Sequence, residues 1–336
     1  MSFKQKTAGT LACFATAAIL SGCNAQQFSL PGSANNFAEQ AKYTHSVDIL
    51  WVIDNSGSMG TGTVSTPSRQ QMLSSQVGLF INGLNKTGLD YQMGVTTMDM
   101  SPTGPQGSFI YQSGTPVIMN SSAGNLLSDL AGRIGASPGG GSPVARGMDA
   151  VIAATSAPNI NGPTAGFLRP SSLLVLIFLT DQNDASSADP NNDVSYLDSI
   201  RPPFLQGDKG WVANYMGVMP NDPNCTTSAW KFSSPGTRYI NLATASGGDS
   251  ESICSGDLTS ALTGVTSRVL ELTTAYPLNG APDPTSIVVT VNGATVPQDA
   301  TNGWTYSSTD NTIRFHGTAV PAIGSSISVT FNPAHL

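Results

Sequence analysis

The hydrophobic residues of this chain first follow the pattern of buried strands alternating with helices. Residues 47–53 form a short, nearly continuous apolar run rich in β-branched residues, which suits a strand buried on both faces of a parallel sheet. Residues 68–84 follow with apolar positions at near-helical spacing and predict a helix. Residues 173–179 form the most apolar stretch beyond the N-terminal region and predict a central strand.

The same alternation continues through most of the chain. It predicts further strands at 91–96, 212–218 and 239–242, a β excursion at 107–119, and helices at 126–134, 143–154 and 258–273. Strands that alternate with helices predict an α/β fold with a doubly wound, mostly parallel sheet flanked by helices. We place this domain at residues 46–275.

Beyond residue 275 the pattern changes to short alternating strands separated by turn residues. Strands are predicted at 286–290, 303–306, 312–316 and 326–331, with no helix among them. We therefore expect a small C-terminal all-β module at residues 276–336. Its core is small, so we expect it to pack on the main domain or on neighbouring strands.

Charged residues are scarce, which narrows the classes of partner. Only 10% of the 336 residues are charged, and the formal net charge is -7. The chain has no cluster of Lys or Arg, so it lacks the basic surface by which proteins bind nucleic acid. The same absence argues against electrostatic attachment to anionic lipid.

The N-terminus has the features of a secretion signal. Lys4 and Lys6 precede an apolar run at residues 10–20, which is too short to span a bilayer. The segment Leu20-Ser21-Gly22-Cys23 then resembles a lipobox, the bacterial motif whose cysteine is diacylated and becomes the new N-terminus. This implies a signal peptide at residues 1–22 and a lipid anchor on Cys23. The alternative is an ordinary signal peptide with an incidental cysteine.

The residues that follow Cys23 are predicted to form a tether. Residues 23–45 are rich in Asn, Gln, Ala and Ser, as expected of a linker between lipid and domain. Asn24, rather than Asp, follows the cysteine, which in bacteria with two membranes implies sorting to the outer membrane. We therefore expect a lipid-anchored protein of the bacterial cell envelope, at its periplasmic face or on the cell surface.

Two cysteines remain for the folded part of the chain. Cys13 belongs to the signal peptide and Cys23 to the anchor, so Cys225 and Cys254 are left. Two cysteines in an oxidising compartment usually pair, and closing a loop of roughly 30 residues stabilises a fold by about 3 kcal/mol. The alternative is two free or metal-binding thiols.

Oxygen-bearing side chains gather after the first predicted strand. Asp54, Ser56 and Ser58 are spaced by two, so in an extended segment they point the same way, and Gly57 and Gly60 allow the backbone to turn around a ligand. Loops beyond the carboxyl ends of parallel strands are the usual place for ligand sites. Carboxylate and hydroxyl oxygens suit Mg²⁺, Mn²⁺ or Ca²⁺ better than zinc or copper.

The segment Asp48-Ile49-Leu50-Trp51-Val52-Ile53-Asp54-Asn55-Ser56-Gly57-Ser58-Met59 resembles the first-strand motif of von Willebrand factor A domains. In that family Asp-x-Ser-x-Ser is the metal-ion-dependent adhesion site, to which a Thr and an Asp from two later loops also contribute. The matching positions here are Ser142, after the glycines 139–141, and Asp181, after residues 173–179. The resemblance covers roughly residues 46–275.

Ser142 departs from the usual threonine of the family. Serine keeps the hydroxyl oxygen but lacks the methyl group that restrains its rotamer, so a weaker metal ligand is expected. Ser142 also suits the N-cap of a helix with Pro143 at its first position.

The resemblance implies a function as well as a fold. In such domains protein and water oxygens hold the ion, with Mg²⁺ the favoured cation, and the remaining coordination position accepts a carboxylate from a partner protein. We therefore expect a metal-dependent binding or adhesion protein and not an enzyme. One alternative is a structural envelope lipoprotein that binds no partner through a metal.

The other alternative is a serine hydrolase that uses Ser56 or Ser58. Neither serine lies in a Gly-x-Ser-x-Gly segment, and the histidines are His45, His316 and His335. The sequence therefore gives this alternative little support.

Two weaker acidic signals remain. Residues 189–193 alternate oxygens as a calcium loop does, but Val194 replaces the expected glycine and Ile200 the distal glutamate. A polar loop is the default prediction there. Asp184 is predicted to lie on the surface, with the outer shell of the metal site as the alternative.

Overall fold

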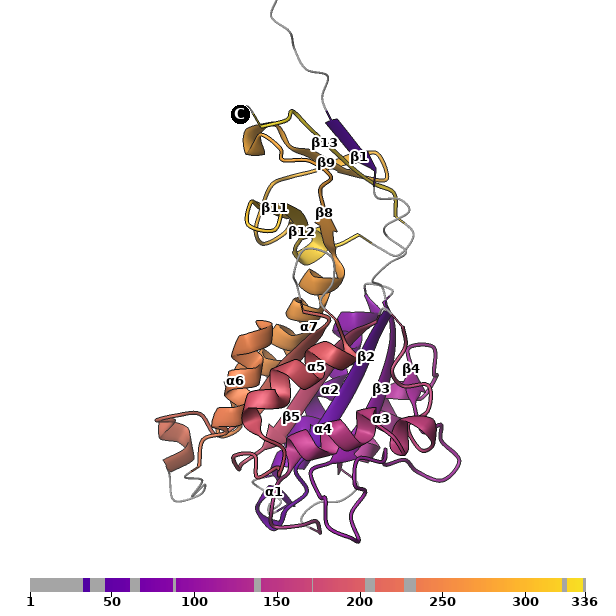
Figure 1. The fold of residues 1–336 in the computed structure, drawn as a ribbon, viewed down its shortest axis with the longest axis vertical. Coiled ribbons are helices and arrows are strands. Elements are labelled where there is room, and N and C mark those ends of the chain that lie inside the picture. The colour runs from indigo at the N-terminus through magenta and orange to yellow at the C-terminus, as the bar shows by residue number, and fades with distance from the viewer. Residues whose placement is uncertain are drawn as a thin grey trace, which may run out of the picture. The chain divides into compact units, whose positions relative to one another are not determined.

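The folded part of the chain has the α/β architecture shown in Figure 1. The computed structural model describes residues 33–36, 46–60, 67–86, 89–135, 140–170, 172–202, 209–226, 234–321 and 325–334. The predicted signal peptide, Cys23, His45 and His335 lie outside these residues.

A six-stranded, mostly parallel sheet forms the centre of the α/β part. Its strands lie in the order β4-β3-β2-β5-β6-β7, and the β3–β4 pair alone among them is antiparallel. The strands are β2 (Ser46–Ile53), β3 (Asp90–Thr97), β4 (Met119–Asn120), β5 (Leu173–Thr180), β6 (Trp211–Gly217) and β7 (Ser250–Ser252). All eight residues of β5 are buried, as their uniform hydrophobicity predicts for a central strand.

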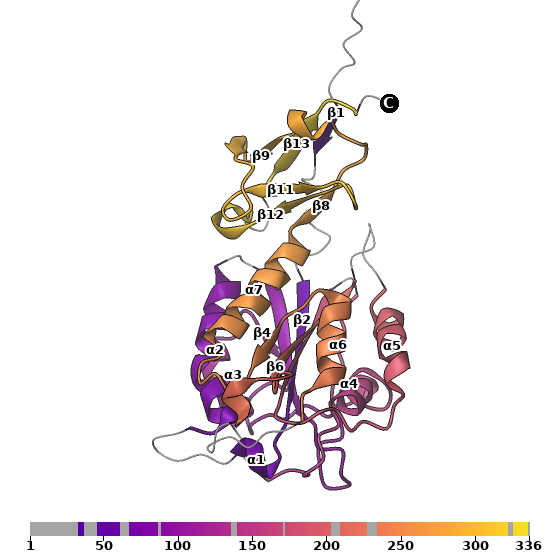
Figure 2. The same cartoon turned by 90° about the vertical axis from the view of Figure 1, so that its left-hand side faces the viewer.

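Helices cover both faces of this sheet, which confirms the predicted doubly wound α/β fold. The cores on the two faces place α2, α3 and α7 on one side and α4, α5 and α6 on the other, and Figure 2 shows the two layers with the strands between them. The helices are α1 (Gly57–Gly60), α2 (Arg69–Asn85), α3 (Leu126–Gly135), α4 (Gly147–Thr155), α5 (Asp193–Ile200), α6 (Thr237–Ser246) and α7 (Thr259–Thr273).

The start of α2 shows how local sequence fixes a helix beside the candidate site. Ser68 is the N-cap, and its hydroxyl accepts a hydrogen bond from the Gln71 amide at 3.2 Å. The Gln71 side chain accepts in return from the Ser68 amide at 2.9 Å, which completes a capping box. The predicted helix at 68–84 is therefore confirmed, with its first turn firmly placed.

One predicted strand is wrong. Residues 239–242 lie inside α6, whose buried Tyr239, Leu242, Ala243 and Ser246 recur at helical spacing. The strand that completes this edge of the sheet is β7, a three-residue segment of Ser, Glu and Ser that carries no hydrophobic pattern.

Two further predictions need correction. The expected β excursion at 107–119 is mostly turns and irregular chain, and only β4 at its end is paired with the sheet. Buried Arg133 donates to the carbonyl oxygens of Pro116 and Val117, the latter at 2.7 Å, and so holds this irregular segment. Helix α4 begins at Gly147, four residues later than expected, because the Arg146 amide donates to the Met98 carbonyl at 3.1 Å.

The C-terminal part is all-β, as predicted, and consists of two small antiparallel sheets. One sheet has the order β11-β12-β8 and the other the order β1-β13-β9-β10. Their strands are β8 (Ala275–Pro277), β9 (Val288–Val291), β10 (Ala294–Val296), β11 (Trp304–Ser307), β12 (Thr312–Phe315) and β13 (Ile327–Phe331). A separate hydrophobic core that includes Trp304, Ile313, Phe315 and Val329 stabilises this part.

The remaining strand corrects the expectation of a plain tether over residues 23–45. β1 (Ser33–Asn36) pairs antiparallel with β13, with Ser33 opposite Phe331 and Asn36 opposite Ser328. Backbone pairing needs no hydrophobic side chains, so the polar composition of this segment hid the strand. None of the helices in the described ranges is long and apolar enough to cross a membrane.

Candidate metal centre

Asp54, directly after β2, is fixed by its neighbours on β5. Its amide donates to the Leu179 carbonyl at 2.9 Å, which continues the pairing of the two strands. Its Oδ2 accepts from the Thr180 hydroxyl at 2.6 Å, and its Oδ1 accepts from the Ser56 amide at 2.8 Å. Burial raises the pKa of Asp54, and these hydrogen bonds oppose the rise in part. The carboxylate is therefore preorganised at the carboxyl edge of the sheet.

The two serines place their hydroxyl groups side by side. Ser56 Oγ lies 3.3 Å from Ser58 Oγ, and the side-chain amide of Gln182 donates from Nε2 to Ser56 Oγ at 3.2 Å. Ser58 belongs to the short helix α1, which is anchored by the fully buried Met59. The segment is not extended, as the spacing of two predicted, because Ser58 lies in a helical turn, but the two hydroxyl groups still lie close together.

Asp181, directly after β5, is the most unusual group in the site. It is 4% exposed, and among the residues that the structure describes neither carboxylate oxygen has a hydrogen-bond partner of normal geometry. Burial raises the pKa of this carboxyl to about 6, and nearby Asp54 adds to the rise, while the Ser58 hydroxyl and the Arg69 guanidinium oppose it. Buried carboxylates without hydrogen-bond donors are costly, and a bound cation satisfies them.

Ser142 lies in a loop packed against the Asp54 to Ser58 loop. The Gly141 amide donates to the Asn55 carbonyl at 2.9 Å, and a Cβ at position 141 would lie 2.2 Å from the Asn55 side-chain oxygen. Only glycine therefore allows the two loops to approach this closely. The Ser142 hydroxyl accepts from the Val144 amide at 3.1 Å in a turn that precedes α4, so its predicted role as the N-cap of that helix is wrong.

The structure thus brings the three predicted loops to one edge of the sheet. Five oxygen-bearing side chains come from them: Asp54, Ser56, Ser58, Ser142 and Asp181. The set contains two carboxylates and three hydroxyl groups, and the Asp181 carboxylate has buried oxygens without a hydrogen-bond partner of normal geometry among the described residues. Such a set of oxygen donors fits a hard divalent cation.

Several residues that support the site were not predicted. Thr180 and Gln182 flank Asp181 and bond to Asp54 and Ser56, respectively. Asp99, two residues beyond β3, is 7% exposed. Burial raises the pKa of its carboxyl, but hydrogen bonds from Ser101 and from the Ser142 amide bring it below its usual value. An acidic residue just past a strand end was the available signal for Asp99.

The two weaker acidic signals have structural uses instead. The Asp184 side chain is buried, so its predicted place on the surface is wrong. It accepts hydrogen bonds from the Gly147 amide at 2.8 Å and from the Tyr239 hydroxyl at 2.9 Å. Both Asp193 oxygens bond to Arg238 at 2.7 Å, and Asp189 caps a 3-10 helix at Pro190–Asn192. Residues 189–193 therefore start helices and do not have the arrangement of a calcium loop.

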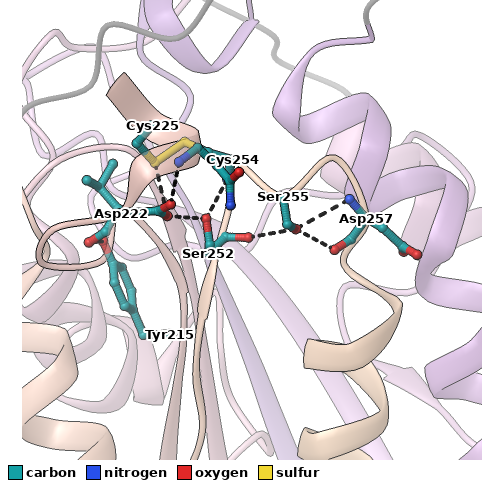
Figure 3. The surroundings of a disulfide bond; sticks show 9 residues. Tyr215, Asp222, Cys225, Ser252, Cys254, Ser255 and Asp257 are labelled. Carbon is teal, nitrogen blue, oxygen red and sulfur yellow. Dashed lines mark hydrogen bonds between the residues drawn. A yellow bond between two sulfur atoms is a disulfide. The ribbon is translucent and has the colours of Figure 1, made fainter. Parts of the chain in front are cut away.

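Cys225 and Cys254 form the predicted disulfide, with Cα atoms 5.2 Å apart (Figure 3). It joins the chain after β6 to the chain after β7. The Ser252 hydroxyl donates to buried Asp222 beside it, as Figure 3 shows. Asp222 and the two sulfurs lie close enough together to suggest a metal cluster, but sulfurs bonded to each other are not thiolate ligands.

No protein family and no curated protein matches this sequence. Among solved structures, proximal thread matrix protein 1 from the mussel byssus is similar, with 13% identity and a TM-score of 0.42, over 70% of this chain and 50% of that one. The same mussel protein, with a zinc-occupied MIDAS motif, matches with the same values.

Two bacterial structures are also similar. A von Willebrand factor type A protein from Catenulispora acidiphila matches at 14% identity and a TM-score of 0.40, over 86% of this chain and 58% of that one. The pilus adhesin SpaC from Lactobacillus rhamnosus GG, in an open conformation, matches at 13% and 0.41, over 85% and 38%. The chain spans about half the length of the mussel protein and less of SpaC.

Proposed function

We propose that this chain binds a divalent cation at the edge of its parallel sheet and, through the cation, an acidic residue of a partner protein. Mg²⁺ is the favoured ion, and Mn²⁺ or Ca²⁺ would suit the same oxygens. The proposed ligands are Asp54, Ser56, Ser58, Ser142 and Asp181.

The observation that carries this proposal is the carboxylate of Asp181. A structural carboxylate buried to this degree normally accepts hydrogen bonds, as Asp184 and Asp193 do in the same protein. Asp181 instead has no such partner of normal geometry for either oxygen within the described part of the chain, and it lies next to the Ser58 hydroxyl. A cation would bind these oxygens directly.

The residues of the site would contribute to ion binding in different ways. Asp54 and Asp181 supply negative charge, and the serine hydroxyls supply neutral oxygens that complete the coordination without cancelling more of the positive charge. Thr180 and Gln182 hold Asp54 and Ser56 in place before any ligand arrives. A bound cation would offer a remaining coordination position to a carboxylate of the partner.

The test is the thermal stability of the chelator-treated chain with added Mg²⁺, Mn²⁺, Ca²⁺ or Zn²⁺. At an ion concentration of 100 times Kd, binding should stabilise the native state by about 2.7 kcal/mol. Asp181→Asn should abolish this shift while preserving the shape of the side chain. Asp129→Asn is the matched control, because it removes the same charge from a partly exposed position on α3. An unchanged melting temperature of the native chain with every ion would contradict metal binding.

We further propose that the protein has no hydrolytic activity. Among the described residues the one histidine, His316, bonds to Thr305 at 2.7 Å in the C-terminal part, and none contacts Ser56 or Ser58. A serine nucleophile needs such a base within hydrogen-bond reach. Labelling of Ser56 or Ser58 by a fluorophosphonate probe would overturn this proposal.

The lipid anchor and the envelope location are proposed from the sequence motif at Cys23. Mass spectrometry of the processed N-terminus should find a diacylated cysteine, and an unmodified Cys23 would remove the anchor.

The partner can be sought by capture from envelope extracts of the source bacterium. Capture should require the divalent ion, and the same protein retained after chelation would argue for binding at another surface.

A further inference from the structure

A buried arginine lies beside the candidate metal centre. Arg69 is the first residue of α2 and is 1% exposed. Burial lowers the pKa of its guanidinium to about 10, so the group remains positively charged at neutral pH. A buried charge of this kind needs an opposite charge nearby.

Among the described residues, the acidic group that acts on Arg69 is Asp181. The carboxylate raises the pKa of the guanidinium, and the guanidinium in turn lowers that of the carboxyl. Both side chains are at least 96% buried, so little water separates or screens them. Arg69 also lies at the edge of the sheet where the proposed metal ligands lie, because α2 begins a few residues after α1 and contacts it.

The charge of Arg69 changes the net charge of the centre once an ion is bound. Asp54 and Asp181 together carry two negative charges, so a divalent ion bound to them alone would form a neutral group. A neutral group attracts an additional carboxylate only weakly. With Arg69 included, the ion, Asp54, Asp181 and Arg69 together carry one net positive charge in a buried environment, where electrostatic attraction is strong. The charge of Asp99 lies on the Ser142 side of the centre, where it accepts hydrogen bonds from Ser101 and from the Ser142 amide.

We propose that Arg69 is a specificity-determining residue whose fixed positive charge weakens the binding of the cation and strengthens the binding of a carboxylate at the remaining coordination position. This inference rests on the proposed function, since it concerns the same centre. Arg69 is not itself a metal ligand, and its positive charge favours an anionic group at the remaining coordination position.

The chain offers a matched control in Arg133 on α3. Arg133 is also 1% exposed, but its guanidinium donates to the carbonyl oxygens of Pro116 and Val117 and to the Thr115 hydroxyl. Its hydrogen-bond partners therefore belong to the irregular segment before β4, and the acidic group that acts on it is Asp129 on the same helix, so none of these described partners is a proposed metal ligand. Loss of either arginine removes a buried cation, but only one of the two should change the affinities of the site.

The test measures two affinities of the full chain that should move in opposite directions. Calorimetry gives the Kd for Mn²⁺, and acetate is then titrated into the Mn²⁺-loaded protein while the paramagnetic relaxation of its methyl protons is followed. Arg69→Met should bind Mn²⁺ on the order of tenfold more tightly and acetate several-fold more weakly. Arg69→Lys keeps the charge and should keep both affinities within about twofold of the native values.

The outcomes separate this inference from the proposed function. If Arg69→Met weakens both affinities or changes neither, while the native chain binds Mn²⁺, the role of Arg69 is refuted and the metal centre stands. If neither the native chain nor Arg69→Met binds Mn²⁺, both proposals fail. Arg133→Met should leave both affinities unchanged, and a tighter Mn²⁺ affinity in that control would also count against a local effect. Should Arg69→Met not fold, Arg69→Gln provides the second neutral variant.

Discussion

Replacing Thr180 by valine should disconnect Asp54 from its support without changing the shape of the site. The Thr180 hydroxyl donates to Asp54 Oδ2 at 2.6 Å and accepts from the Gln182 amide at 3.0 Å. Thr180 and Asp54 are both at most 1% exposed, so water cannot replace these bonds without rearrangement. Valine has nearly the same volume but neither donates nor accepts.

The two lost hydrogen bonds set the expected magnitude. A hydrogen bond to a charged group contributes about 1.5–3 kcal/mol, and an unsatisfied buried amide costs about 1 kcal/mol or more. The free energy of unfolding should therefore fall by about 2–4 kcal/mol, which lowers Tm by roughly 5–10 °C in a domain of this size. Because the carboxylate of Asp54 also becomes harder to ionise, Mn²⁺ should bind roughly tenfold more weakly.

Chemical denaturation in the presence of a chelator measures the first effect, and calorimetric titration with Mn²⁺ measures the second. Thr155→Val is the control, because the Thr155 hydroxyl is also buried and donates to the Val151 carbonyl at 2.7 Å, but within α4. That variant should lose stability and keep the native Mn²⁺ affinity. A Thr180→Val protein that binds Mn²⁺ as tightly as the native chain would refute the supporting role assigned to Thr180.

Three other predictions concern stability. Breaking the disulfide with Cys225→Ala and Cys254→Ala should cost about 3.6 kcal/mol for the 29-residue separation, and a denaturation midpoint equal to that of the oxidised native chain would contradict this. Gly141→Ala should destabilise the fold by about 1–3 kcal/mol and weaken Mn²⁺ binding, because the added methyl group meets Asn55; an unchanged Mn²⁺ affinity would show that the two loops tolerate separation. Burial raises the pKa of Asp149, but hydrogen bonds from Ser187, Arg146 and Ala188 bring it below its unfolded value. Its contribution is therefore fully present above about pH 4 and is lost as pH falls through the folded pKa, so the stability gap between native and Asp149→Asn chains should narrow below pH 4.

The parts of the fold that could be predicted are those in which burial dictates residue type. β2 and β5 are covered by helices on both faces, so nearly every position is apolar and the strands are visible in the sequence. β7 pairs through backbone groups at the sheet edge, and its Ser, Glu and Ser residues reveal nothing. The segment around Tyr239 was mistaken for a strand, because four residues are too few to distinguish period two from a helical turn.

The candidate site divides in a similar way. The spacing of Asp54, Ser56 and Ser58 is a local feature of the sequence. The resemblance to von Willebrand factor A domains that rests on it predicted which later loops would meet this one. The burial of Arg69 could not be predicted, because an arginine in a helix is usually exposed and nothing nearby in the sequence shows that Asp181 lies beside it. Charge compensation between distant segments becomes visible only in the folded chain.

The pairing of β1 with β13 also has a consequence for the order of folding. Ser33 is among the first described residues to be synthesised, yet its partner Phe331 is among the last. Pairing across such a separation has a high entropic cost of loop closure, so it depends on the elements between them being already folded. β1 therefore stays without its partner strand until β13 has been synthesised, and the pairing of the two is one of the final steps of folding.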